Sequence, residues 1–381
     1  MKPPLGYPCP SSKVCLIRRV LYGLKQAPRE WFDKFNTIIC NLGFTCSPHE
    51  NALFIRRSER GVVLLLVYVD DIIITGDYID GISDLKASLH RTFVMKDLGS
   101  LGYFLGLEVI STDDGIYLCQ AKYASNLLAH ARITNSCTES TPLEPNVRFI
   151  PMDVTVLDNP TLYRQLVGGL IYLTFTRPDI AYPVYVLSQF LSTPRTTHYA
   201  TVLRYIKDTL FYGLYFSAHS SLSLQAYSDI DWTGDPTDRR STTGYCLFLG
   251  DALISWHAKK QMFTARSSTK VEYRALADTT TEVVSICWLL KNLGAPQLSA
   301  TDIFCDNRSS IQIVHNNVFH ERTKHIEIDC HFVRQRILID AIRLITVGTL
   351  DQTADIFTKV HHPTCFRTLL SKLKMVSLAP T

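Results

Sequence analysis

The chain has 381 residues, of which 46% are hydrophobic and 19% are charged, and its formal net charge is +4 at pH 7. The hydrophobic share excludes an intrinsically disordered protein, and the length allows two or three domains with cores of their own. The small positive charge permits nucleic-acid binding without requiring it.

The cysteines and the apolar runs bear on the compartment. The eleven cysteines form no Cys-x-x-Cys pair and are scattered through apolar stretches. Disulfide frameworks and zinc sites need closer spacing, so we expect reduced, mostly buried thiols in an intracellular protein. Residues 1–10 lack an apolar core of signal-peptide length, and the longest apolar run, 62–69, is far shorter than the ~20 residues of a membrane helix. We therefore expect neither secretion nor a membrane partner.

The first part of the chain predicts helices around antiparallel strands. Apolar periodicity and turn residues predict, in chain order, a helix at 28–42, strands at 53–56, 62–69 and 72–75, a helix at 79–91, and a hairpin of strands 102–111 and 116–120. Asp70 and Asp71 would lie at the tip of the hairpin that strands 62–69 and 72–75 form. Two acids there repel each other unless a cation lies between them, although ordinary turn chemistry explains an isolated Asp-Asp pair equally well.

From residue 122 to 216 the signals are helical, with helices expected at 162–176, 180–191 and 198–210. The pattern then changes to strands at 222–229, 244–249 and 252–257, a helix at 271–293, a strand at 302–305, helices at 309–316 and 326–339, a strand at 342–347 and a helix from about 353. A right-handed crossover through helix 271–293 would return strand 302–305 parallel to strand 222–229.

Four carboxylates in this last part form a candidate metal site: Asp229, Glu272, Asp306 and Asp355. Asp229 and Asp306 end strands that would be parallel, so they should meet at one crevice, and Glu272 and Asp355 in the first turns of two helices would reach the same place. Taken singly, the helical acids are explained by the helix dipole. Together, the four favour Mg²⁺, and two such ions about 3.5–4 Å apart would activate a water and stabilise the leaving oxygen in phosphodiester cleavage.

Residues 222–360 resemble the ribonuclease H domain of copia-type LTR retrotransposon polyproteins. The matching strings are Tyr227-Ser228-Asp229-Ile230-Asp231-Trp232, Arg239-Arg240-Ser241-Thr242-Thr243-Gly244-Tyr245, Cys305-Asp306-Asn307 and Arg322-Thr323-Lys324-His325. The resemblance places Asp229, Glu272, Asp306 and Asp355 on the family's metal-binding acids. It implies hydrolysis of the RNA strand of RNA:DNA hybrids with two Mg²⁺ ions, or with Mn²⁺ as a substitute. The family usually has an acid where Lys270 stands, and we expect a modest effect of this change.

The N-terminal part resembles the palm of a copia-type reverse transcriptase, through Leu21-Tyr22-Gly23-Leu24-Lys25-Gln26-Ala27-Pro28, Tyr68-Val69-Asp70-Asp71 and Tyr103-Phe104-Leu105-Gly106. The resemblance implies that Asp70 and Asp71 are metal-binding acids of a residual polymerase site and that Lys25 and Gln26 lie near the incoming nucleotide. A family polymerase carries its fingers and a first catalytic aspartate before the string that opens this chain. We therefore expect no independent polymerase activity.

Basic residues surround the candidate ribonuclease site in the sequence. Those expected to contact nucleic-acid phosphates are Arg239, Arg240, Lys259, Arg266 and Lys270, and a solvated charged face is the alternative for each. For His320, His325 and His331 we favour packing or capping roles over proton transfer.

The sequence thus predicts an α+β and α/β protein with four segments. These are a partial reverse transcriptase palm at 1–121, a helical connection at 122–221, a ribonuclease H domain with a mixed five-stranded sheet and flanking helices at 222–360, and a tail at 361–381. The expected partners are an RNA:DNA hybrid or other nucleic acid and further Pol fragments, in the cytoplasm, a virus-like particle or the nucleus. The alternative is a decayed, non-catalytic remnant that at most binds nucleic acid.

Overall fold

The computed structural model describes residues 24–69, 71–133, 137–144, 160–192, 199–235, 237–262, 264–265, 267–315 and 327–378. Contacts divide the chain into two compact units, Met1–Gly99 and Ser100–Thr381. In the described part, no helix combines the length and the apolar character that crossing a membrane requires.

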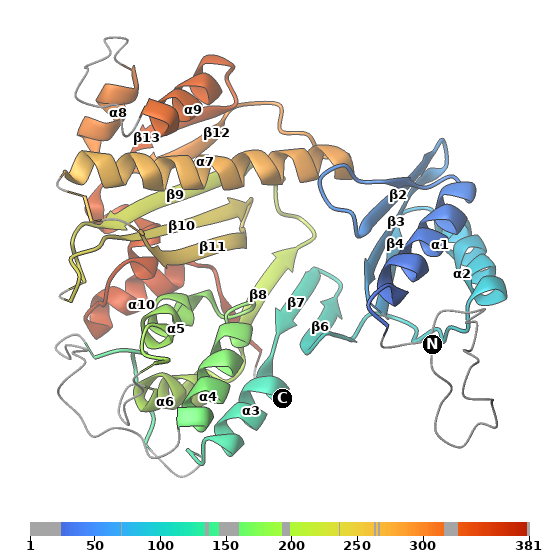
Figure 1. Ribbon diagram of the computed structural model, residues 1–381, viewed down its shortest axis with the longest axis horizontal. Helices are drawn as coiled ribbons and strands as arrows, with labels where there is room; N and C mark the ends of the chain where they lie inside the picture. Colours follow the sequence, from blue (N-terminus) through green and yellow to red (C-terminus); the bar gives the residue numbers. More distant parts are fainter. Residues whose placement is uncertain are drawn as a thin grey trace, which may run out of the picture. The chain divides into compact units, whose positions relative to one another are not determined.

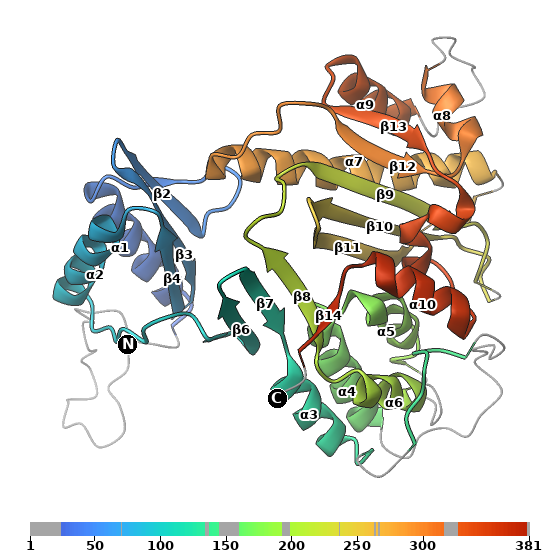
Figure 2. The same cartoon turned by 180° about the vertical axis from the view of Figure 1, so that it is seen from behind.

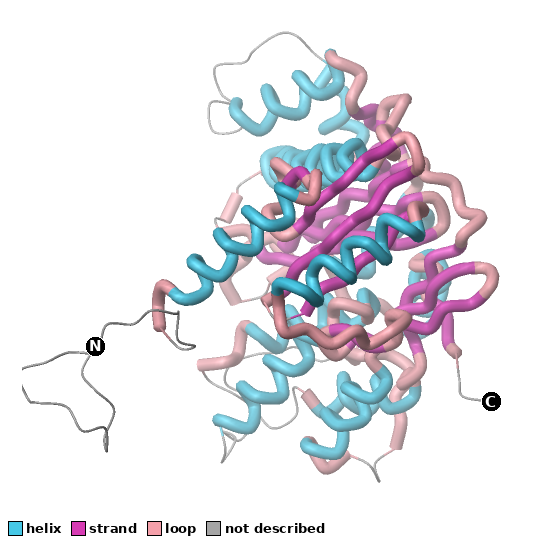
Figure 3. The backbone as a smooth tube through the Cα atoms, turned by 90° about the vertical axis from the view of Figure 1, so that its right-hand side faces the viewer, coloured by secondary structure: helices cyan, strands magenta, loops and turns pink. Residues whose placement is uncertain are grey.

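The first unit is a four-stranded antiparallel sheet with two helices. Its elements are α1 (Ala27–Asn41), β1 (Thr45–Cys46), β2 (Leu53–Ser58), β3 (Gly61–Tyr68), β4 (Asp71–Gly76) and α2 (Ile79–Thr92), with strand order β1-β2-β3-β4. Alternate residues of β3, among them Val63 and Leu65, are buried in one cluster with Phe35 of α1 and Leu85 of α2. Both helices therefore cover the same face of the sheet (Figure 3).

The second unit begins with a small sheet and a group of helices. These are β5 (Tyr103–Phe104), β6 (Leu107–Thr112), β7 (Gly115–Cys119), α3 (Ala121–His130), α4 (Pro160–Leu173), the 3₁₀ helix η1 (Pro178–Ile180), α5 (Ala181–Ser188), α6 (Ala200–Asp208) and β8 (Tyr212–Ser217). The elements that follow are β9 (Leu224–Asp231), β10 (Thr242–Leu249), β11 (Ala252–Lys260), α7 (Ser268–Leu293), β12 (Thr301–Cys305), α8 (Arg308–His315), α9 (Glu327–Leu338), β13 (Ile342–Thr346), the 3₁₀ helices η3 (Thr349–Asp351) and η4 (Thr353–Phe357), α10 (Pro363–Lys372) and β14 (Val376–Ser377).

The central sheet of this unit has the order β11-β10-β9-β12-β13. β9, β10 and β11 are antiparallel neighbours, whereas β12 runs parallel to both β9 and β13. The expected mixed five-stranded sheet is thus confirmed, and the crossover through α7 brings β12 back beside β9.

Side-chain alternation along β10 supplies both faces of this sheet with apolar residues. Tyr245 and Leu247 point into one cluster, which α7 and α9 complete. Cys246 and Phe248 point into the other, which contains residues of α4, α5, α6 and α10. Because helices cover the sheet on both sides (Figure 1), β10 is buried along almost its whole length. Polar groups at the edge of this sheet therefore need a specific reason to be buried.

Two local expectations, on residues 212–217 and on the burial of the cysteines, are wrong. Residues 212–217 form strand β8 rather than helix, since Tyr212, Tyr215 and Phe216 favour a pleated surface and β8 pairs with β7. The expected tail carries α10, with Phe366 and Leu369 buried, and β14, which pairs with β8 (Figure 2). The nine described cysteines are free, but only four of them are buried: Cys119, Cys246, Cys305 and Cys330.

The segment that carries Asp355 also differs from the expectation. It is the 3₁₀ helix η4 rather than the start of an α-helix, because the N–H of Asp355 bonds to the carbonyl of Gln352 and the N–H of Thr358 bonds to that of Asp355. Glu272 lies in the second turn of α7, because this helix begins at Ser268. The four-segment division of the chain stays a prediction.

Candidate active site

Asp229 lies near the end of β9 and is only 3% exposed. Its neighbour on β10 is Gly244. A Cβ atom added at Gly244 would lie 2.6 Å from the Thr358 side chain and 2.8 Å from the Phe357 side chain. Glycine at this position therefore lets the end of η4 approach the sheet directly beside Asp229.

Asp306 directly follows β12, whose residue Phe304 pairs with Tyr227 of β9. Since β9 and β12 are parallel, Asp306 leaves its strand at the same edge of the sheet as Asp229. The carboxylate of Asp229 raises the pKa of Asp306, after the larger effect of burial. The two acids thus lie at the same edge of the sheet and influence each other electrostatically, and their meeting in one metal site stays a prediction.

Glu272 projects from α7 and is 7% exposed. Asn307, next to Asp306, donates a hydrogen bond from Nδ2 to Glu272 Oε1 at 3.2 Å. The second carboxylate oxygen, Oε2, is buried without a hydrogen-bond partner. An unpaired carboxylate oxygen in such a place is costly unless it is protonated or meets a cation.

Asp355 reaches the cluster from η4. The amide of Gln352 bonds to the carbonyl of Ser228 at 2.9 Å, which fixes η4 beside β9. Thr358 donates its hydroxyl to Asp229 Oδ2 at 2.5 Å, and Lys359 Nζ lies 2.8 Å from Asp355 Oδ1. Gln352, Thr358 and Lys359 were not among the predicted site residues, although the position of Lys359 four residues after Asp355 is a spacing typical of ion pairs on a helix.

Burial makes the carboxylates of Asp229, Glu272 and Asp306 hold their protons more tightly. Burial raises the pKa of Asp229 to about 6, and the neighbouring Asp355 adds to this effect. Burial also raises the pKa of Glu272 to about 8, with a smaller contribution from Asp229 and Asp306. Asp231, which the sequence reasoning missed, has a pKa raised to about 6 by burial. Side chains two positions apart on a strand lie on the same face, so Asp231 shares the face of Asp229. This spacing in the sequence could have predicted Asp231 as a site residue.

The donor chemistry of this cluster fits Mg²⁺, since the groups are hard carboxylate oxygens and Glu272 Oε2 lacks a partner. Among the described residues, no three His, Cys, Asp or Glu side chains are close enough together to hold one ion.

The basic residues of the predicted nucleic-acid surface have different surroundings. Arg239 is exposed in the loop between β9 and β10, and Lys259 is exposed on β11. Arg240 pairs with Asp238 at 3.5 Å, and Lys270 lies half-buried in the first turn of α7. Arg266, His320 and His325 lie outside the described residues. The role of each in nucleic-acid binding stays a prediction.

The expected polymerase residues belong to the first unit. Asp71 opens β4 and is exposed, and Asp70 lies outside the described residues. Lys25 and Gln26 are exposed just before α1. Because Asp70 lies outside the described residues, the geometry of the Asp70–Asp71 pair is not defined. The expected loss of polymerase activity stays a prediction.

A family model described as "Reverse transcriptase (RNA-dependent DNA polymerase)" matches residues 1–145. The chain is 41% identical over 371 residues to the retrovirus-related Pol polyprotein from transposon RE1 of Arabidopsis thaliana, a match that covers 97% of this chain. It is also 32% identical to the putative transposon Ty5-1 protein YCL074W of Saccharomyces cerevisiae, over 69% of this chain and 87% of that protein. The chain belongs to the copia-type retrotransposon Pol family. This membership confirms the resemblance to copia-type Pol polyproteins that the sequence motifs indicate. The chain spans 25% of the length of the RE1 polyprotein.

Solved structures with similarity to this Pol fragment include ribonuclease H1 from the archaeon Halobacterium salinarum NRC-1, at 16% identity and a TM-score of 0.26, over 36% of this chain and 94% of that chain. The foamy viral protease-reverse transcriptase in complex with RNA/DNA hybrid has 11% identity and a TM-score of 0.43, over 87% of this chain and 39% of that chain.

Proposed function

We propose that this Pol fragment is a ribonuclease H that hydrolyses the RNA strand of RNA:DNA hybrids with the help of Mg²⁺. The observation that supports it best is the meeting of Asp229, Glu272 and Asp306 with Asp355 at one edge of a covered sheet. Asp229 interacts electrostatically with each of the other three acids. Four carboxylates that repel one another in a buried place are destabilising, so their presence favours a function that needs the negative charge.

Each residue has a distinct part in this proposal. Asp229, Glu272, Asp306 and Asp355 would hold the metal. Bound Mg²⁺ would lower the pKa of a water molecule and neutralise charge on the scissile phosphate. Asn307 orients Glu272 through its hydrogen bond to Oε1, and Thr358 orients Asp229. Lys259 and Arg239, both exposed, would bind backbone phosphates and fix the register of the hybrid without reading its sequence.

The test is cleavage of a labelled RNA:DNA hybrid by the purified chain in MgCl₂. The variant Asp306→Asn should lose activity by about 10²-fold or more, in line with the loss of one electrostatic group at a reacting centre. Asp302→Asn is a matched control, since Asp302 lies on β12, which Asp306 follows, but pairs with the exposed Arg343 at 2.7 Å. This control should cleave like the wild type.

A catalytically inactive remnant that only binds nucleic acid is the alternative. Binding of the hybrid without cleavage by the wild type, at any MgCl₂ concentration, would favour the remnant and refute the proposed activity. Equal cleavage by the wild type and Asp306→Asn would refute the assigned site.

A further inference from the structure

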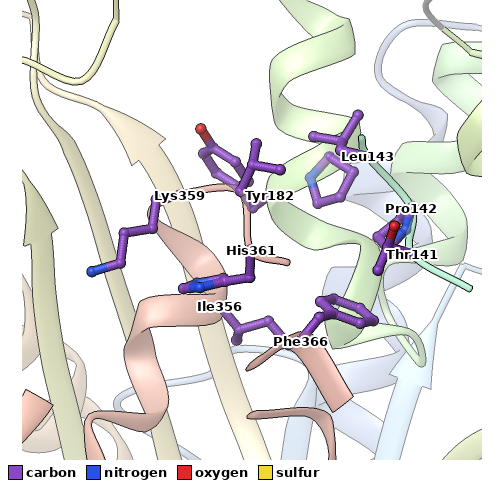
Figure 4. A pocket seen from close by; sticks show the side chains of 10 residues that line it. Thr141, Pro142, Leu143, Tyr182, Ile356, Lys359, His361 and Phe366 are labelled. Carbon is purple, nitrogen blue, oxygen red and sulfur yellow. The ribbon is translucent and has the colours of Figure 1, made fainter. Parts of the chain in front are cut away.

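Lys359 stands between the acid cluster and a small cavity at its back. Its aliphatic stem lines this cavity with Tyr182, Ile356 and His361, and its amino group points away from the other lining side chains (Figure 4). The amino group lies 2.8 Å from Asp355 Oδ1, and the aspartate side chain is 7% exposed. The stem is thus held by apolar packing while the charge is presented to the acids.

The charge of Lys359 acts on more than its direct partner. Burial raises the pKa of Asp229, Asp231 and Asp306, and in each case the positive charge of Lys359 works in the opposite direction. Burial by itself would lower the pKa of Lys359, but the contact with Asp355 and the charges of Asp229 and Asp231 raise it overall. The ammonium group therefore stabilises the ionised form of several acids at once.

A divalent cation would need the same oxygens. The ammonium group occupies Asp355 Oδ1 and repels any second cation close to it. Without the ammonium charge, the acids of the metal-free protein would repel each other more strongly, which lowers its stability. A metal ion would then meet no competing charge and would bind more tightly. Loss of a purely structural lysine would lower the stability but would not tighten metal binding.

We propose that Lys359 is a counter-cation built into the acid cluster, which holds Asp355 in place without metal and competes with Mg²⁺ for the site. Lys359 thereby sets the Mg²⁺ concentration at which the site fills. This inference rests on the proposed function, because it requires that the four acids bind metal.

The test is thermal unfolding of the full chain in EDTA and across a MgCl₂ titration, without nucleic acid. Lys359→Met keeps the stem and removes the charge. In EDTA it should unfold about 3 °C or more below the wild type. The MgCl₂ concentration that raises its unfolding temperature by about 2 °C above the EDTA value should be about fivefold lower than for the wild type, in the range typical of coupling between two ligands. Lys359→Arg keeps the charge and should return this concentration toward the wild-type value.

The matched control is Lys372→Met, which removes a lysine paired with Asp351 at 3.3 Å, outside the acid cluster. It should need the same MgCl₂ concentration as the wild type for the same rise in unfolding temperature. If Lys359→Met does not fold, the neutral variant Lys359→Gln takes its place.

Several results would overturn the inference. If the neutral variants need the wild-type MgCl₂ concentration for the same rise in unfolding temperature, the competition is refuted while the proposed function stays intact. Failure of both neutral variants to fold at every MgCl₂ concentration also refutes it, because metal would then be unable to replace the lysine charge. Absence of any stabilisation of the wild type by MgCl₂ refutes both the inference and the metal site on which it rests.

Discussion

The side-chain amide of Gln352 donates a hydrogen bond to the carbonyl oxygen of Ser228 at 2.9 Å. Its side-chain oxygen accepts one from the N–H of Ala354 at 3.2 Å. Ser228 directly precedes Asp229, and Ala354 directly precedes Asp355. One fully buried glutamine thus joins the two segments that carry these acids, which are 126 positions apart in the sequence (355 − 229).

Replacement of this glutamine should therefore affect both stability and catalysis. Gln352→Leu keeps most of the volume but leaves the buried Ser228 carbonyl without its partner, so we expect a loss of about 1–3 kcal/mol of unfolding free energy. The displaced η4 should lower kcat for hybrid cleavage while KM stays near the wild-type value. Urea unfolding and steady-state kinetics measure the two effects.

Gln297 offers a control at the opposite end of β9, where it accepts from the N–H of Leu224 at 2.9 Å and donates to the carbonyl of Leu222 at 2.8 Å. Gln297→Leu should reduce stability with kcat unchanged. Equal kcat values for Gln352→Leu and Gln297→Leu would contradict a positioning role for Gln352.

The raised pKa of Glu272 predicts how the stability of the metal-free protein depends on pH. Its folded-state pKa, about 8, lies above the ordinary value of 4.5 because the side chain is buried. The folded state therefore binds more protons than the unfolded state in this window. Stability contributed by the neutral carboxyl is present below pH 4.5 and is lost as the pH rises toward about 8, by at most about 1.4 kcal/mol per pH unit.

Urea unfolding in EDTA at pH 5 and pH 8.5 tests this prediction. Glu272→Gln removes the titrating group, so the variant should lose less stability than the wild type between the two pH values. An equal loss in the variant and the wild type would show that Glu272 is already ionised at pH 5 in the folded metal-free protein.

The ion pair between Arg177 and Asp179 should matter for stability more than any surface pair. Arg177 Nη2 lies 2.7 Å from Asp179 Oδ2, and both side chains are almost fully buried. Arg177 also donates to the carbonyl of Thr209, and Tyr205 donates to Asp179. Asp179→Asn would leave a buried guanidinium charge without its counter-ion, at a cost of about 3–5 kcal/mol.

The comparison for this prediction is Asp302→Asn, which breaks a similar two-bond contact with Arg343 at the surface. Since Arg343 is well exposed, this change should cost about 1 kcal/mol or less. Similar urea midpoints for Asp179→Asn and Asp302→Asn would show that the buried pair adds no stability of its own.

Lys270 should contact the hybrid rather than the metal. It lies in the first turn of α7, where Glu272 two positions later points in another direction. Lys270→Ala should weaken hybrid binding, reduce the slope of log K against log salt concentration by about 1, and leave kcat within about twofold. Lys291→Ala, in the last turn of the same helix, should leave binding unchanged. A fall in kcat with unchanged binding would contradict this role.

Local sequence patterns are sufficient to predict the strands and helices with a regular spacing of apolar residues. The period of two in β9 and β10 and the long apolar helix α7 could be predicted because these elements must cover a hydrophobic core, and such patterns depend on neighbouring residues alone. Local patterns do not predict strand β8, because its pairing with β7 is a long-range contact. They predict an α-helix where η4 lies, because burial and the Gln352 contacts, not propensity, fix the 3₁₀ helix.

The sequence by itself determined the family, the central sheet and the acids Asp229, Glu272, Asp306 and Asp355 as candidates, because each is tied to a recognisable string or strand end. Only the tertiary structure decided that Asp229 interacts with the other three and that Gln352, Thr358 and Lys359 hold the cluster. The reason is physical: the packing of η4 against Gly244 and β9 depends on contacts between residues more than a hundred positions apart, which no local pattern encodes.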